Sequence, residues 1–200
     1  MDDVTAFVLA GGKSTRMGRD KALLELEGET LLERALKRAG AVTPRTFIVG
    51  GAGKFANFGD VVEDVYPERG PLGAIHAALE CSQTEWNLML AVDMPFMKEE
   101  FLRWMTAVAR WGNATVTVPQ VGGKLQPLCG VYRKAFAGVA QRSLERGENK
   151  IDRLFSEVTT RVIEESDLKS AGFFRDLFRN VNTQEEWEAA IRSERERVSQ

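Results

Sequence analysis

The sequence predicts an α/β fold, in which a doubly wound, mostly parallel sheet carries helices on both of its faces. Short apolar runs alternate with helix-like patterns through most of the chain. Capping residues open several of the helical patterns. The first apolar run passes directly into closely spaced glycines, as expected where a buried strand ends in a tight turn. A chain of 200 residues is long enough for one such domain with a sizeable core.

The predicted strands are apolar runs bounded by turn-forming residues. The runs over residues 4–9 and 46–49 are among the clearest, whereas the last two of the series are weaker. In chain order, the predicted strands span residues 4–9, 46–49, 88–92, 114–118, 128–132 and 161–163.

Helix signals fall between these runs. Thr30 and Glu33 form a capping box ahead of an apolar stripe that Gly40 closes. Pro71 suits the first position of the next helix, because the N–H that proline lacks would have no partner there. Both stretches therefore predict helices that pack one apolar side against the sheet.

Three more helices are predicted downstream. Residues 135–144 form one that Gly147 closes. Thr183 and Glu186 make a second capping box, which opens a final helix. We assign residues 1–191 to one domain and residues 192–200 to the charged end of that helix. In the remaining helix, residues at helical spacing form a stripe that we expect to face the core, namely Phe101, Trp104, Met105, Val108 and Trp111.

The overall charge is nearly balanced. Lysine and arginine total 27 against 29 aspartate and glutamate, so the formal net charge is -2 and indicates neither a nucleic-acid partner nor a membrane. No apolar run approaches the roughly 18 residues of a membrane-spanning helix, and the acidic start does not resemble a signal peptide. We therefore expect a cytoplasmic protein whose cysteines, Cys81 and Cys129, are reduced and buried.

The segment from residue 9 to residue 21 combines glycines with cations. The glycines are Gly11, Gly12 and Gly18, and the basic residues are Lys13, Arg16 and Lys21. Backbone N–H groups and cations together can cradle an anion such as a phosphate. A P-loop is excluded because Phe7 stands where that motif needs a glycine, and the glycine spacing does not fit a dinucleotide-binding fingerprint. The alternative is an ordinary glycine-rich turn with solvated lysines.

Asp93 directly follows the buried run over residues 88–92. In open α/β sheets, ligands bind outside the carboxyl ends of the strands, which is also the edge that residues 9–21 leave. A carboxylate at this edge is well placed to hold Mg²⁺ against substrate phosphates. The alternative is an aspartate that caps a helix or forms an Asx turn.

Several other polar residues each have more than one interpretation. Asp64 is either a wall of the same site or a plain loop acid, and Gln126 either reads a polar ligand edge or belongs to a turn. Asn182 and Thr183 are expected to cap the last helix. The single histidine, His76, is expected to be satisfied or exposed on a helix, and acyl-transfer catalysis or a histidine zinc site is not indicated.

Together these motifs resemble those of molybdenum cofactor guanylyltransferases, which are MobA-like members of the nucleotidyltransferase group. The opening signature is Leu9-Ala10-Gly11-Gly12, Ser14, Arg16-Met17-Gly18 and Asp20-Lys21. Further motifs follow in the family's order, namely Gly70-Pro71-Leu72-Gly73, Asp93-Met94-Pro95-Phe96, Gln126-Pro127-Leu128 and Asn180-Val181-Asn182-Thr183. The resemblance covers residues 4–190 and implies a Rossmann-like nucleotidyltransferase fold. The paired glycines and the last motif favour the guanylyl branch over the cytidylyl branch.

The resemblance implies that GTP and molybdenum-bound molybdopterin react to give the guanine dinucleotide cofactor and pyrophosphate. It implies that the backbone of the opening signature binds the nucleotide, at Leu9, Ala10, Gly11 and Gly12. Asp64 matches an acid that contacts GTP, and Asp93 matches the residue that contacts GTP and ligates Mg²⁺. Lys21 would contact the phosphates, and Arg16 would neutralise the developing pyrophosphate. The positions matched to the second substrate are Asn180, Asn182 and, by a looser alignment, Lys150.

Two departures from the family pattern stand out. Gly50 and Gly51 occupy a segment in which many members carry an asparagine that contacts the nucleotide, and Gln184 replaces a proline before the last helix. Two alternative hypotheses keep nucleotidyl transfer: a cytidylyltransferase for the same cofactor, and a sugar-phosphate nucleotidyltransferase. A further hypothesis is that the protein is not an enzyme but binds GTP and delivers the cofactor. Proteins of molybdopterin synthesis and molybdoenzyme maturation are the expected partners.

Overall fold

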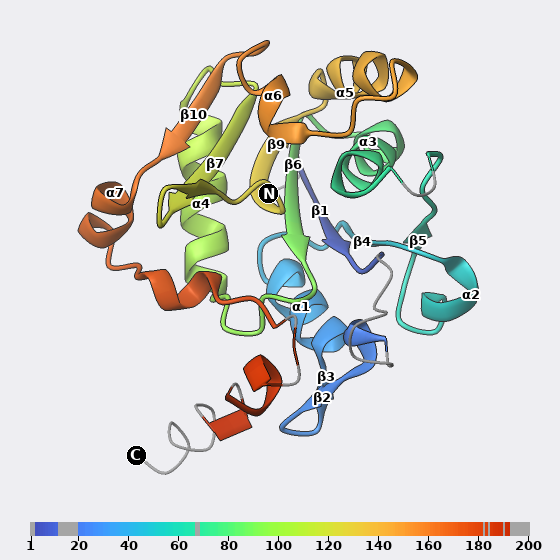
Figure 1. The fold of residues 1–200 in the computed structure, drawn as a ribbon, viewed down its shortest axis with the longest axis vertical. Coiled ribbons are helices and arrows are strands. Elements are labelled where there is room, and N and C mark those ends of the chain that lie inside the picture. Colours follow the sequence, from blue (N-terminus) through green and yellow to red (C-terminus); the bar gives the residue numbers. More distant parts are fainter. Residues whose placement is uncertain are drawn as a thin grey trace.

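The computed structural model describes residues 3–11, 20–66, 69–181, 183, 185–189 and 191–192, and Figure 1 shows its fold. The strands are β1 (Val4–Leu9), β2 (Glu25–Leu26), β3 (Glu29–Thr30), β4 (Thr46–Val49), β5 (Val61–Val62), β6 (Trp86–Ala91), β7 (Val116–Val121), β8 (Lys124–Leu125), β9 (Cys129–Arg133) and β10 (Thr160–Ile163). The helices are α1 (Leu31–Gly40), α2 (Ala52–Phe55), α3 (Pro71–Cys81), α4 (Glu99–Trp111), α5 (Phe136–Glu145), α6 (Ile151–Leu154) and α7 (Glu165–Ser170), with 3-10 turns η1 (Lys21–Leu23) and η2 (Arg175–Phe178).

One large sheet runs through the molecule in the order β10-β7-β9-β6-β1-β4-β5, and β8 pairs with β7. Strand β1 is parallel to β4 on one side and to β6 on the other, while β9 is antiparallel to both of its neighbours. The register pairs Leu9 with both Val49 and Ala91, so the carboxyl ends of β1, β4 and β6 meet at one edge. The mostly parallel α/β class is confirmed.

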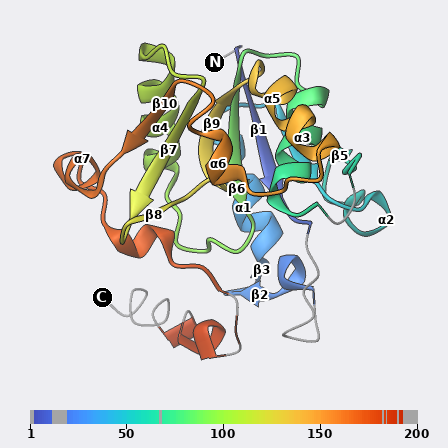
Figure 2. The ribbon, with the colours of Figure 1, turned by 45° about the horizontal axis from the view of Figure 1, so that its top comes forward.

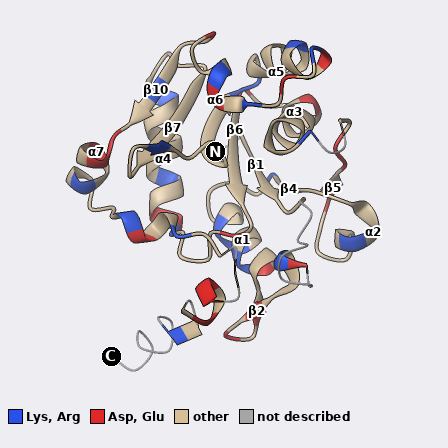
Figure 3. Ribbon diagram, viewed as in Figure 1, with Lys and Arg blue, Asp and Glu red and all other residues tan. Residues whose placement is uncertain are grey.

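Helices cover both faces of this sheet, as predicted. One apolar cluster joins the sheet to α1 and α4, and a second joins it to α3, α5 and α6. In Figure 2, α3, α5 and α6 lie in front of the sheet. The central strands β1 and β6 carry no charged residue, and Figure 3 shows them tan throughout, whereas blue and red lie on the surrounding helices and loops. No helix in the described part of the chain has the length and apolarity needed to cross a membrane.

The local signals in the sequence act as expected. Glu33 N donates to Thr30 Oγ1 at 3.2 Å and Thr30 N donates to Glu33 Oε2 at 2.8 Å, which completes the capping box of α1. Pro71 is at the first turn of α3. At the other end of the chain, Thr183 and Glu186 exchange the equivalent bonds at 3.1 and 3.2 Å. The helix that follows is packed onto the core, because Trp187 is buried.

The predicted core stripe of α4 is wrong at Trp111, which is 92% exposed. The buried residues of this helix are Phe101, Leu102, Met105, Thr106 and Ala109. At about 100° per residue, their centre lies on the opposite side of the helix from Trp111. Trp104 and Val108 pack only partly against the core. The buried stripe is therefore rotated about the helix axis relative to the predicted one. Its buried side includes Ala109, which is small, and Thr106, whose Oγ1 donates to Leu102 O at 2.8 Å.

The cysteines differ from each other. Cys129 is buried, as predicted, but Cys81 is exposed, so the prediction of two buried thiols is wrong for Cys81. Cys81 is the last residue of α3, where the chain leaves the sheet's face.

The observed strands begin and end a few residues away from the predicted positions. Strand β6, for example, begins at Trp86 and includes the polar Asn87. This residue can be buried because its Nδ2 donates to backbone carbonyls, including that of Tyr132 at 3.3 Å.

Candidate functional site

A cavity of about 940 Å³ opens at the carboxyl edge of the sheet. It is bordered by the ends of β1, β4, β5 and β6 and by the start of α3. This is the position at which open α/β sheets bind ligands. Its lining residues are Leu9, Ala10, Gly11, Asp20, Lys21, Val49, Gly50, Gly51, Glu63, Asp64, Gly70, Pro71, Ala74, Ala91, Val92, Asp93 and Leu128.

Backbone hydrogen bonds hold the rim of this cavity together. Ala10 N and Gly11 N both donate to Val49 O, at 3.0 and 3.1 Å. Val92 N donates to Leu9 O at 3.1 Å, and Gly50 N donates to Val62 O at 3.0 Å. Since each bond joins adjacent strands just beyond their ends, segments far apart in the sequence form one continuous rim.

One side of the cavity carries a lysine and an aspartate. Lys21 Nζ lies 3.8 Å from Asp93 Oδ2, and both side chains are mostly buried. Lys21 begins η1, whose N-cap Asp20 accepts from Ala22 N at 3.1 Å and pairs with Lys54 at 3.1 Å. Burial raises the pKa of the Asp93 carboxyl above its ordinary value, and the Lys21 ammonium opposes that shift.

The other side of the cavity carries two neighbouring carboxylates that follow β5. Asp64 Oδ1 accepts from Tyr66 N at 2.8 Å, and Glu63 Oε1 accepts from Ala52 N at 2.9 Å. Burial raises the pKa of the Asp64 carboxyl, and the hydrogen bond from Tyr66 and the proximity of His76 oppose this shift. The site therefore has one side on which an ammonium is paired with a carboxylate and another side with two carboxylates.

His76 lies behind the side with two carboxylates. It is buried, its ring lies 5.3 Å from that of Tyr66, and neither ring nitrogen has a hydrogen-bond partner among the described residues. The expectation of a satisfied or exposed histidine is therefore wrong. The reason is that α3 packs against the sheet and against α5, so most of its circumference is buried.

The structure brings together most of the predicted nucleotide contacts. The cavity is lined by Leu9, Ala10, Gly11, Lys21, Asp64 and Asp93. Gly12, Arg16 and Asn182 lie outside the described residues. Asn180 is exposed, and the next residue, Val181, donates its N–H to Asp93 O at 3.0 Å. The segment that follows β6 and contains Asp93 is thus adjacent to the last motif.

Two other candidates lie away from the cavity lining. Lys150 is exposed at the start of α6. Gln126 is half-buried, and its side-chain amide donates to Lys124 O at 3.4 Å, as expected of a turn residue. Leu128, two residues later, does line the cavity.

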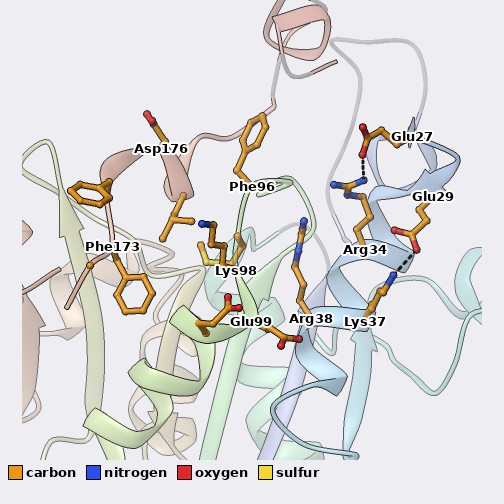
Figure 4. Close-up of a pocket in the computed structure, with 15 residues that line it drawn as sticks. Glu27, Glu29, Arg34, Lys37, Arg38, Phe96, Lys98, Glu99, Phe173 and Asp176 are labelled. Atoms are coloured by element: carbon orange, nitrogen blue, oxygen red, sulfur yellow. Dashed lines mark hydrogen bonds and ion pairs between the residues drawn. The ribbon is translucent and has the colours of Figure 1, made fainter. Parts of the chain in front are cut away.

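A second groove, of about 830 Å³, separates α1 from the segment before η2. Figure 4 shows Arg34, Lys37 and Arg38 of α1 on one side and Phe173 and Asp176 on the other. Its basic side chains are matched by acidic ones, including the pairs Glu27–Arg34 at 3.6 Å and Glu29–Lys37 at 3.1 Å. It shares no lining residue with the cavity at the sheet edge. Because its lining includes no residue from the carboxyl ends of β1, β4 or β5, where open α/β sheets bind ligands, it is the weaker candidate for the substrate site.

The sequence interpretation did not include Glu63. Adjacent residues on a strand point to opposite faces, so strand alternation alone would place only one of Glu63 and Asp64 in the site. Strand β5 ends at Val62, however, and the pleat no longer separates the two side chains. The pair of acids directly after an apolar run is the signal that was available.

The sheet order and the cavity at the carboxyl edge define a mostly parallel α/β protein with helices on both faces of its sheet. The sequence matches the MobA-like NTP transferase domain over residues 6–162, and the chain belongs to this family. A relative from Clostridium perfringens, named probable molybdenum cofactor guanylyltransferase, is 31% identical over 192 residues, which cover 94% of this chain and 96% of the relative.

Solved structures agree with the fold. The structure of molybdopterin-guanine dinucleotide biosynthesis protein A from Archaeoglobus fulgidus superimposes with a TM-score of 0.83 at 24% identity, covering 96% of this chain and 99% of that chain. A protein from Aquifex aeolicus superimposes with a TM-score of 0.74 at 30% identity, covering 90% of this chain and 94% of its own.

Proposed function

We propose that this protein transfers GMP from GTP to the terminal phosphate of molybdenum-bound molybdopterin and releases pyrophosphate. The observation that carries the proposal is that Asp93 and Lys21 lie together, beside the backbone of Leu9 to Gly11, in one cavity at the sheet edge. The relatives' names supply the identity of the nucleotide and of the acceptor.

The reaction needs little acid–base chemistry from the protein. A phosphate oxygen of the acceptor is already anionic, so it forms its bond to the α-phosphorus of GTP without losing a proton to a base. The bond between the α-phosphorus and the bridging oxygen breaks, and pyrophosphate leaves. The described lining includes no histidine, which agrees with a mechanism of positioning and charge neutralisation.

Each cavity residue then has a role. The Lys21 ammonium attracts the β- and γ-phosphates, and Arg16, which lies outside the described residues, is assigned by resemblance to the leaving pyrophosphate. Asp64 contacts the nucleoside, and the backbone of Leu9 to Gly12 binds along it. We assign the acceptor to the side of Asp93 where Asn180 and Asn182 run, because Val181 N donates to Asp93 O. Lys150 does not line the cavity, and its match to the second substrate stays a prediction.

The donor set fits a magnesium ion that arrives with the substrate. Among the described residues, no group of three or more His, Cys, Asp or Glu side chains is placed to hold a metal by itself. Magnesium bound with nucleotide phosphates needs only one or two protein carboxylates, and Asp93 provides one that faces the cavity. When bound, the ion would neutralise negative charge on the reacting phosphates.

The test is pyrophosphate release from GTP, CTP or other triphosphates, with molybdenum-bound molybdopterin or sugar phosphates as acceptor and with Mg²⁺. We expect release with GTP and molybdopterin. Lys21→Ala and Asp93→Ala should each lower the rate by roughly 10²–10³, the usual effect of losing one charge-stabilising contact.

The control is Lys169→Ala, since Lys169 is exposed on α7 and does not line the cavity. Its rate should equal that of the wild type, and circular dichroism should show all variants folded. Near-normal rates in Lys21→Ala or Asp93→Ala would reject the assignments, and tight GTP binding without release would favour a delivery protein.

A further inference from the structure

The polar side chains of the cavity are arranged in a definite order across the sheet edge. Asp93 follows β6, and Glu63 and Asp64 follow β5, which lies on the far side of β1 and β4. The three strand spacings between β6 and β5 amount to about 14 Å. On the β6 side Asp93 has an ammonium partner, Lys21, whereas the pair Lys54–Asp20 ties the N-cap of η1 to α2, which packs against β5.

The β5 side carries two carboxylates that are not neutralised by an ion pair within the described part of the chain. Neither Glu63 nor Asp64 forms an ion pair with any described basic residue. Two carboxylates repel a triphosphate, whereas Lys21 attracts it. The charge distribution therefore orients a bound nucleoside triphosphate, with its phosphates beside β6 and its base beside β5.

The surface between the two sides is made of backbone. Gly50 cannot carry a side chain without displacement of Phe55, because a Cβ atom there would lie 2.9 Å from two carbons of that buried ring. The Glu63 carboxylate lies beside this backbone: it accepts from Ala52 N, at the start of α2 and next to Gly51, at 2.9 Å.

This bond leaves most of the accepting capacity of Glu63 unused. A carboxylate has about four lone-pair positions, and the bond to Ala52 N occupies one. An ionised carboxylate accepts hydrogen bonds and cannot donate them. A base recognised by Glu63 must therefore present donors, and must not present a ring acceptor next to its amino group.

Guanine meets this requirement, because its N1–H and 2-amino group are adjacent donors. Cytosine and adenine each place a ring nitrogen acceptor beside their amino group. We propose that Glu63 is a specificity-determining residue, which accepts from the 2-amino edge of guanine; this inference rests on the proposed function. Asp64 is the acid matched to GTP contact by resemblance, and Glu63 adds discrimination among bases.

The experiment measures equilibrium binding of GTP, ITP and CTP to the full chain by calorimetry, with Mg²⁺ present. ITP lacks the 2-amino group of GTP. The variant Glu63→Gln retains an oxygen that accepts from Ala52 N but presents an amide donor to the base. Glu157→Gln is the matched control, because Glu157 is exposed and does not line the cavity.

We expect the wild type to prefer GTP over ITP by roughly tenfold or more, the usual contribution of a hydrogen bond to a charged group. In Glu63→Gln this preference should fall to near one, and the preference for GTP over CTP should also fall. Glu157→Gln should match the wild type. If Glu63→Gln does not fold, Glu63→Asp, which keeps the charge but shortens the reach, should lose the same preference.

Equal weakening of GTP and ITP in Glu63→Gln, or an unchanged ratio, would overturn the inference. Wild-type binding that does not distinguish GTP from ITP would overturn it too, while leaving guanylyl transfer intact. Tighter wild-type binding of CTP than of GTP would instead overturn the proposed function, and the inference with it.

Discussion

Asp93 shows how a functional residue conflicts with the stability of the fold. Its carboxylate is mostly buried, and the Lys21 ammonium is 3.8 Å away, so the attraction of Lys21 does not cancel the cost of burial. The net effect raises the pKa of the Asp93 carboxyl. A substrate-borne cation would remove this cost when the nucleotide binds.

This conflict predicts a pH-dependent gain in stability for Asp93→Asn. Because the pKa of Asp93 is higher in the folded state, its contribution to stability is fully present below the unfolded value of about 3.9 and is lost as pH rises through the folded pKa. The variant should therefore melt at a higher temperature than the wild type at pH 7.5.

The melting difference should disappear near pH 3.5, where both states carry the protonated acid. Thermal unfolding followed by circular dichroism at the two pH values measures it. Asp60→Asn, at an exposed position outside the cavity, should show no difference at either pH. A lower melting temperature for Asp93→Asn at pH 7.5 would show that the carboxylate stabilises the fold.

Single residues of the site differ in how well the sequence predicts them. Asp93 and Lys21 could be predicted because one stands at the end of an apolar strand and the other in a glycine-rich basic turn. Glu63 could not, because strand alternation assigns it to the face opposite Asp64. His76 was misjudged because one sequence does not reveal which sides of a helix are covered.

Among the structural elements, the turn from β4 into α2 has a strict steric requirement at one of its two glycines. Gly50 and Gly51 are adjacent, but a Cβ on Gly50 would meet the Phe55 ring at 2.9 Å, whereas a Cβ on Gly51 would have nothing within 4 Å. Phe55 is 1% exposed and cannot move aside freely. The two glycines are therefore a test position, Gly50, and a matched control position, Gly51.

Gly50→Ala should lower the free energy of unfolding by about 1–3 kcal/mol, as overpacking does in a well-packed region. Gly51→Ala should change it by less than about 0.5 kcal/mol. Chemical denaturation of both variants measures the two values. Equal effects would show that contact with Phe55 does not determine the glycine at position 50.

Helix boundaries were predicted where their chemistry is local. The Thr30–Glu33 and Thr183–Glu186 capping boxes and Pro71 of α3 act within a few residues, so the sequence contains all the information they need. The buried face of α4 is not local. Its rotation away from Trp111 depends on the strands and on Phe173, which packs on Phe101 at 5.2 Å.

For the whole molecule, alternation of strands and helices was enough to predict the layers but not the strand order. Parallel strands imply a shared carboxyl edge, so Asp93 could be placed near the glycine turn. That β5 lies two strands beyond β1, and so carries Glu63 to the far side of the cavity, follows from tertiary packing. The balanced groove between α1 and η2 likewise depends on packing alone.

The most direct test of this arrangement is a crystal structure with a non-hydrolysable GTP analogue and Mg²⁺. We expect the nucleotide across the carboxyl edge of the sheet, with its phosphates and the ion at Lys21 and Asp93 and its guanine at Glu63 and Asp64. A nucleotide in the groove beside α1, or one with its base against Lys21, would contradict it.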